Sequence, residues 1–125
     1  MAMFENITGS EKWEFIFGDQ KISKIILNRI IFQGSSARFY FYCNVDDLSL
    51  KDRWVKNGYN VVEFELFVGG ITNFSGGATN YTGEASFVVK GEAPSKNVIF
   101  KIDDGLLEFE AVNVFLENVG GSVYD

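Results

Sequence analysis

Apolar and polar residues alternate one by one along much of this chain, and this pattern restricts the fold more than any other feature. In residues 37–45 one set of alternate positions is apolar: Phe39, Phe41, Cys43 and Val45. The other set is Arg38, Tyr40, Tyr42 and Asn44. Successive side chains of a β-strand point to opposite faces, so this run predicts a strand with one face in the core. Residues 60–68 and 81–89 repeat the pattern and predict two further strands.

Turns separate these runs, and glycine must supply most of them because Pro94 is the only proline. An apolar run at residues 25–32 precedes Gly34-Ser35-Ser36 and should form a hairpin with residues 37–45. Asp103-Asp104-Gly105 separates the alternating residues 97–102 and 106–115, and Asp and Gly accept the positive φ that tight turns need. This second hairpin should contribute the following side chains to the core: Val98, Phe100, Ile102, Leu107, Phe109 and Ala111.

One short helix is predicted near the N-terminus. Thr8-Gly9-Ser10-Glu11 has the pattern of a capping box, in which the Thr8 hydroxyl and the Glu11 carboxylate bind free amides at the helix start. Trp13, Ile16 and Phe17 follow at the spacing of one apolar helix face. Gly18 can take the positive φ that ends a helix.

These patterns predict a mainly β (α+β) fold in a single domain, residues 1–125, with six to seven antiparallel strands and one short N-terminal helix. The strands could form an antiparallel sheet, a sandwich or a partly open barrel. From Asn118 onward the chain is rich in glycine and is predicted to be loose, apart from Val123 and Tyr124.

The residue types restrict the chemistry. The chain has no histidine and a single cysteine, Cys43, so a nucleophile activated by histidine is excluded and the commonest zinc ligands are missing. Glu63 pairs with Glu65, and Glu108 with Glu110, two positions apart on predicted solvent faces rather than across a cleft. We therefore expect no enzyme activity, no cofactor and no bound metal.

Charge restricts the partners. Seventeen acidic residues and eleven basic ones give a net charge of −6. A negative surface repels phosphate and disfavours nucleic acid, but it suits a basic protein, because opposite charge speeds encounter. Acidity can equally serve solubility alone. No signal-peptide pattern and no apolar run of about 20 residues is present, so we expect a cytoplasmic protein that avoids membranes and is monomeric when free.

The candidate binding residues are outward-facing acids, loop acids and nearby aromatic residues: Asp46, Asp47, Asp52, Trp54, Glu63, Glu65, Glu108, Glu110, Tyr40 and Tyr42. Exposed aromatic rings beside charge occur both at protein interfaces and on sugar-binding platforms. A carbohydrate- or peptide-binding β module is therefore the alternative to a protein that binds one basic protein partner, and a self-assembling structural protein is a third possibility.

Two stretches carry a family resemblance. Residues 9–18, GSEKWEFIFG, resemble the short helix that begins members of the immunity protein 50 family, and Arg53-Trp54 followed by residues 59–67, YNVVEFELF, is similar to that family's middle pattern. The segment with Pro and His that members often carry after the helix has no counterpart at residues 19–23. The resemblance implies a bacterial immunity protein of a toxin–immunity or contact-dependent growth inhibition system, which binds and neutralises a cognate toxin domain. An acidic antidote would suit a basic nuclease toxin, because such a toxin must itself bind nucleic acid.

Overall fold

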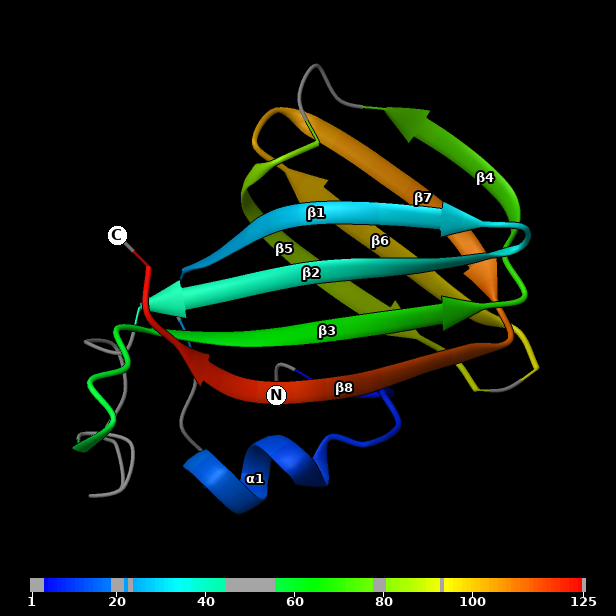
Figure 1. Ribbon diagram of the computed structural model, residues 1–125. Coiled ribbons are helices and arrows are strands. Elements are labelled where there is room, and N and C mark those ends of the chain that lie inside the picture. The colour runs from blue at the N-terminus through cyan, green and yellow to red at the C-terminus, as the bar shows by residue number, and fades with distance from the viewer. Residues whose placement is uncertain are drawn as a thin grey trace.

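The computed structural model describes residues 4–18, 22, 24–44, 56–77, 81–92 and 94–124 (Figure 1). The helix α1 and eight strands lie in these ranges. The elements are α1 (Glu11–Phe17), β1 (Ile25–Gln33), β2 (Ser36–Asn44), β3 (Val61–Gly69), β4 (Thr72–Gly77), β5 (Gly83–Lys90), β6 (Lys96–Ile102), β7 (Gly105–Ala111) and β8 (Asn113–Ser122). The predicted mainly β class with one short helix is confirmed. None of the helical segments in these ranges is long and apolar enough to cross a membrane.

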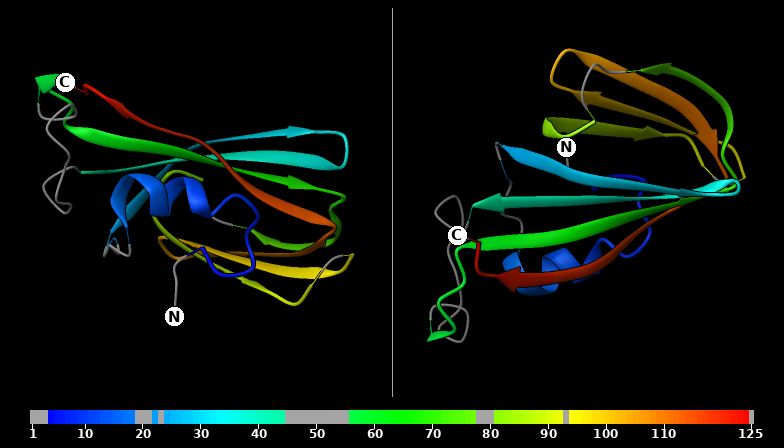
Figure 2. Two further views of the ribbon diagram at one scale, coloured as in Figure 1. Left: turned by 90° about the horizontal axis from the view of Figure 1, so that it is seen from below. Right: turned by 45° about the horizontal axis from the view of Figure 1, so that its top comes forward.

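The strands form a single antiparallel sheet in the order β4-β7-β6-β5-β1-β2-β3-β8. This sheet folds over on itself, so that a front layer of β1, β2, β3 and β8 faces a rear layer of β5, β6, β7 and β4 (Figures 1 and 2). The layers are joined where β1 pairs with β5, over Ile25↔Ala85, Ile26↔Glu84 and Leu27↔Gly83. The outermost strands β4 and β8 do not pair with each other, so the sheet is not closed into a barrel.

The expected number of six to seven strands is wrong, because the described residues contain eight. Residues 106–115 were expected to form one strand, but the chain turns at Val112, where the Val112 N–H donates to the Gly69 carbonyl over 2.9 Å. The turn carries the chain from the rear layer into the front layer. The strand that follows, β8, runs to Ser122, so the segment after Asn118 is paired rather than loose.

Both predicted hairpins are present. In the first, β1 pairs with β2 with one irregularity between Leu27 and Arg29. In the second, β6 pairs with β7 and the two-residue turn holds Asp103 at a φ of 50°. All the side chains predicted for its core are buried: Val98, Phe100, Ile102, Leu107, Phe109 and Ala111.

Stacked phenylalanine rings fill the space between the two layers. Phe39 of β2 stacks on Phe100 of β6 with ring centroids 4.2 Å apart, and Phe41 lies 5.5 Å from Phe87 of β5. These inward positions are the ones that the period-two pattern selects, and each ring is at least nine-tenths buried. The alternation along each strand thus becomes the contact between the two halves of the sheet.

The N-terminal segment covers one open end between the layers (Figure 2). Phe4 packs against Phe64 of the front layer at 5.4 Å and against Phe87 of the rear layer at 5.9 Å, and Trp13 of α1 lies beside Phe4 at 5.3 Å. Four buried rings therefore tie this segment to both halves of the sheet.

The predicted capping box is wrong. The helix follows Ser10, whose side chain makes no capping hydrogen bond. The Thr8 backbone instead pairs with the edge of β8, since its N–H donates to Val114 and its carbonyl accepts from Leu116. Gly18 has a φ of 65°, and its N–H donates to the Glu14 carbonyl, so the predicted helix end is confirmed.

Candidate functional site

The outward side of the front layer gathers charged and aromatic side chains. We call it the front face and define it by these residues: Arg29, Arg38, Tyr40, Tyr42, Glu63, Glu65, Phe67, Phe115, Glu117 and Tyr124. The alternate residues of β2 and β3 are buried between the layers, which forces this set outward. The strand register places Tyr40 directly opposite Glu65 and Tyr42 directly opposite Glu63.

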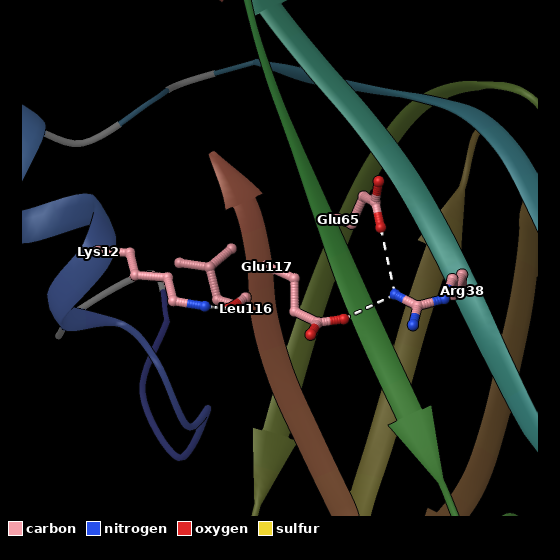
Figure 3. A network of polar contacts seen from close by, with 5 residues as sticks. All are labelled: Lys12, Arg38, Glu65, Leu116 and Glu117. Carbon is pink, nitrogen blue, oxygen red and sulfur yellow. Dashed lines mark hydrogen bonds and ion pairs between the residues drawn. The ribbon is translucent and has the colours of Figure 1, made fainter. Parts of the chain in front are cut away.

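Arg38 lies at the centre of an ion-pair network on the front face. Its Nη1 atom is 2.6 Å from Oε1 of Glu117 and 3.3 Å from Oε2 of Glu65, so the three strands β2, β3 and β8 are joined by one guanidinium (Figure 3). The guanidinium also lies over the ring of Phe67, 4.9 Å from its centroid. The hydrogen bond to Glu117 is the main cause that raises the Arg38 pKa. Arg38 therefore balances two of the acids that surround it.

The N-terminal segment binds the edge of β8 that faces away from β3. Lys12 of α1 reaches the backbone, and its Nζ donates to the Leu116 carbonyl over 3.2 Å (Figure 3). Together with the backbone hydrogen bonds of Thr8, this contact covers part of the free edge of β8, the outermost strand of the front layer.

Glu63 accepts a hydrogen bond from the C-terminal segment. The Tyr124 hydroxyl donates to its carboxylate over 2.7 Å, and the Tyr124 ring lies 4.9 Å from that of Tyr42. Asn60 holds this segment in place, because its side chain donates to the Tyr124 carbonyl and accepts from the Tyr124 N–H. Burial, followed by the bond to Glu63, raises the pKa of Tyr124 to about 12.

Arg29 and Tyr40 form the remaining part of the front face. The Arg29 guanidinium lies over the Tyr40 ring, 4.3 Å from the centroid. Beside them is a polar hollow of about 270 Å³, which Glu63 and Glu65 also line. Cationic, anionic and aromatic groups thus meet in one depression.

The structure separates the predicted site residues into three groups. Tyr40, Tyr42, Glu63 and Glu65 lie together on the front face. Glu108 and Glu110 lie on β7 of the rear layer, where Glu108 is exposed and Glu110 accepts a 2.5 Å hydrogen bond from Asn73. Asp46, Asp47, Asp52 and Trp54 fall outside the described residues. Glu63 and Glu65 therefore do not share one acidic surface with Glu108 and Glu110, because the two pairs lie on different layers of the folded sheet.

Some front-face residues were missed by the sequence reasoning. Arg38 lies on the same outward set as Tyr40 and Tyr42, so the alternation of β2 could have identified it. Glu117 lies just before the segment that was predicted to be loose, and the pairing of β8 with β3 brings it to this face. Tyr124 was excepted from that segment but was not singled out as a site residue, and its hydrogen bonds with Asn60 hold it here.

Comparisons of the chain with protein-family models, with curated proteins and with solved structures find no match. Within the described ranges, no three side chains of His, Cys, Asp or Glu lie together in a group that could hold a metal ion.

Proposed function

We propose that this protein is a non-catalytic binding protein that neutralises a basic bacterial toxin domain, and that the front face is its interface. The observation that carries the proposal is the placement of Tyr40 against Glu65 and of Tyr42 against Glu63 on one continuous outward surface. Aromatic side chains next to charged groups are typical anchors of protein interfaces.

The contacts within the front face support this role, because they fix its side chains before a partner arrives. Arg38 is held by two carboxylates and a ring, and Glu63 and Tyr124 hold each other. Side chains that are already ordered lose less conformational entropy on binding. A preorganised surface suits a protein whose function is to bind one partner tightly.

The charge of the front face and the charge of the molecule have different roles in this proposal. The front face has three acids, Glu63, Glu65 and Glu117, and two arginines, so its net charge is only −1. The chain as a whole carries −6. Long-range attraction of a basic toxin would therefore come from the whole molecule, whereas the arrangement of charges on the front face would select the partner.

The resemblance to the immunity protein 50 family directs the proposal toward a toxin rather than toward another protein. A nuclease toxin is the class that fits best, because its nucleic-acid site must be basic. In this proposal the protein acts as a free monomer in the cytoplasm, where such a toxin would meet nucleic acid.

The experiment uses a basic toxin domain, to be sought first in the genes beside this one, and two charge-reversed variants, E63K/E65K and E108K/E110K. Each variant changes the net charge by +4, so both should slow association, most strongly at low salt. Only E63K/E65K should also speed dissociation, because only this pair would lie in the interface. Equal dissociation rates for both variants and the wild type would remove the front face from the interface.

A glycan array tests the carbohydrate-binding alternative. The proposal predicts no bound sugar family. Binding of one sugar family, lost in Tyr40→Ala and Tyr42→Ala, would assign the same rings to a carbohydrate platform and overturn the toxin-binding proposal.

A further inference from the structure

Strand β1 extends well beyond its pairing with the rear layer. Within the described part of the chain, its pairing with β5 ends at Leu27↔Gly83, Asn28 lies at the irregularity in β1, and from Arg29 to Gln33 β1 pairs with β2 only. Among the residues that the structure describes, the backbone amides and carbonyls on the other edge of this stretch therefore have no partner strand. Such an edge is a template for one more strand.

A groove opens beside this free edge, between β1 and the rear layer. It has a volume of about 620 Å³, and its walls include Ile30 and Phe32 of β1, Phe74 of β4, and Ile71 and Tyr81. Phe32 is 53% exposed, and Phe74 and Tyr81 are each 44% exposed. The Phe32 and Phe74 rings pack edge to face in the lining of the groove, with their centroids 5.8 Å apart.

Hydrogen bonds and strand pairing close the groove at both ends. At one end the Ile71 N–H donates to the Ser35 carbonyl over 2.8 Å, and at the other end Leu27 pairs with Gly83. The free stretch of β1 between them, residues 28–33, would span about 20 Å as a strand. The groove thus has a defined length and an open side.

We propose that an extended segment of the partner protein binds in this groove by adding a strand to the free edge of β1. The unpaired backbone would bind the segment through main-chain hydrogen bonds, and the apolar walls would take alternate side chains of the segment. Arg29 is the one charged residue of the groove lining within the described ranges, so the segment should be apolar, with an acidic side chain at the Arg29 end.

The groove and the front face are continuous, and this continuity favours a segment of the same partner as the occupant. Asn28 and Arg29 line both the groove and the polar hollow of the front face. A protein seated on Tyr40 and Glu65 could therefore extend a segment past Arg29 into the groove. In this respect the inference rests on the proposed function, since it assigns a second contact to the same partner.

The test needs no toxin, so its failure is distinguishable from failure of the proposed function. Phage-displayed random peptides are selected on the full chain, and the selected peptides are synthesised with a fluorescent label. Their affinity is measured by polarisation for the wild type, for Phe74→Asp and Tyr81→Asp in the groove, and for Val88→Asp as control. Val88 lies on β5 with 40% exposure, and it is absent from the groove lining.

The expected peptides carry apolar residues at alternate positions. They should lose affinity by at least about tenfold in both groove variants and keep it in Val88→Asp. Hydrogen exchange should slow at amides of residues 28–33 when the peptide is bound. Thermal melts of each variant establish that it is folded. If Phe74→Asp does not fold, Tyr81→Asp still provides the test.

Each of these results would overturn the inference: no selected peptide, equal affinity for control and groove variants, protection of another strand, or protection of residues 28–33 by a second copy of the chain in a dimer. An apolar dye such as anilinonaphthalene sulfonate provides a further check. A dye that binds the groove and is not displaced by the peptide would assign the groove to a small apolar ligand instead.

Discussion

Phe100→Ala removes the ring at the centre of the contact between the two layers. Phe100 has no exposed surface, and its ring stacks on that of Phe39 with centroids 4.2 Å apart. The ring centroids of Phe41, Phe87 and Phe109 lie 6.0 to 6.1 Å from that of Phe100. A buried Phe→Ala change costs about 3–5 kcal/mol, and loss of a stacked aromatic pair adds about 0.5–1.5 kcal/mol. Because rings surround the vacated space from both layers, little collapse is possible. We therefore expect a loss of about 4–5 kcal/mol in the free energy of unfolding.

Urea unfolding followed by tryptophan fluorescence measures this loss. With a slope of about 2 kcal/mol per molar urea, the midpoint should fall by about 2 M. Phe15→Ala on α1 is the matched control, since Phe15 is 74% exposed and its loss should change stability by no more than about 0.5 kcal/mol. If the two variants lost the same stability, or if Phe100→Ala lost less than about 1 kcal/mol, the packing of one layer on the other would be refuted.

Three further predictions rest on single contacts. Gly34→Ala should lower the free energy of unfolding by about 1 kcal/mol, because of the positive φ alone. Gly76→Ala should lower it clearly more, because its Cβ would lie 2.0 Å from the Leu106 carbonyl oxygen. Urea midpoints compare the two variants, and equal losses would contradict the pairing of β4 with β7. Tyr124 has its pKa raised from 10.0 to about 12, so its contribution to stability is complete below pH 10 and is lost as the pH rises through about 12. The wild type should therefore lose more stability over that interval than Tyr124→Phe, and parallel pH profiles would argue against the Tyr124–Glu63 bond. Arg38→Ala should cost under about 1 kcal/mol, since its side chain is 40% exposed, and a loss of several kcal/mol in urea unfolding would show that the network has a greater structural role.

Local alternation was sufficient to predict the hairpins but not the way in which the sheet folds over. The pairs β1–β2 and β6–β7 join neighbours in sequence, and their inward residues could be read from a period of two. The pairs β1–β5, β3–β8 and β4–β7 join segments far apart in sequence, and no local pattern specifies them. The folded shape therefore had to come from the structure.

The strand count was wrong because a shift in the alternation of inward-facing residues was overlooked, although this shift marks a turn. Inward positions run Leu107, Phe109 and Ala111, and then shift to Val114 and Leu116. An even spacing along one strand would keep all of them on one face, so the odd step between Ala111 and Val114 marks the turn at Val112. Short, glycine-rich β4 gave no comparable signal, because none of its residues is buried.

The candidate site could be predicted only in part, for the same physical reason. Tyr40, Tyr42, Glu63 and Glu65 share a face because β2 and β3 are each amphipathic and pair directly. Whether Glu108 joins them depends on the fold of the whole sheet, which places it on the other layer. Charge alone also misled, since Arg38 lies among these acids and balances two of them.

The central claim is that the front face binds a basic toxin domain. The most direct measurement is surface plasmon resonance of a basic toxin domain found in a neighbouring gene against the wild type, E63K/E65K and E108K/E110K, at low and high salt. The account predicts a stable complex with the wild type, slower association for both variants at low salt, and faster dissociation for E63K/E65K alone. A wild-type chain that does not bind that domain, or a complex whose dissociation is unchanged in E63K/E65K, would contradict it.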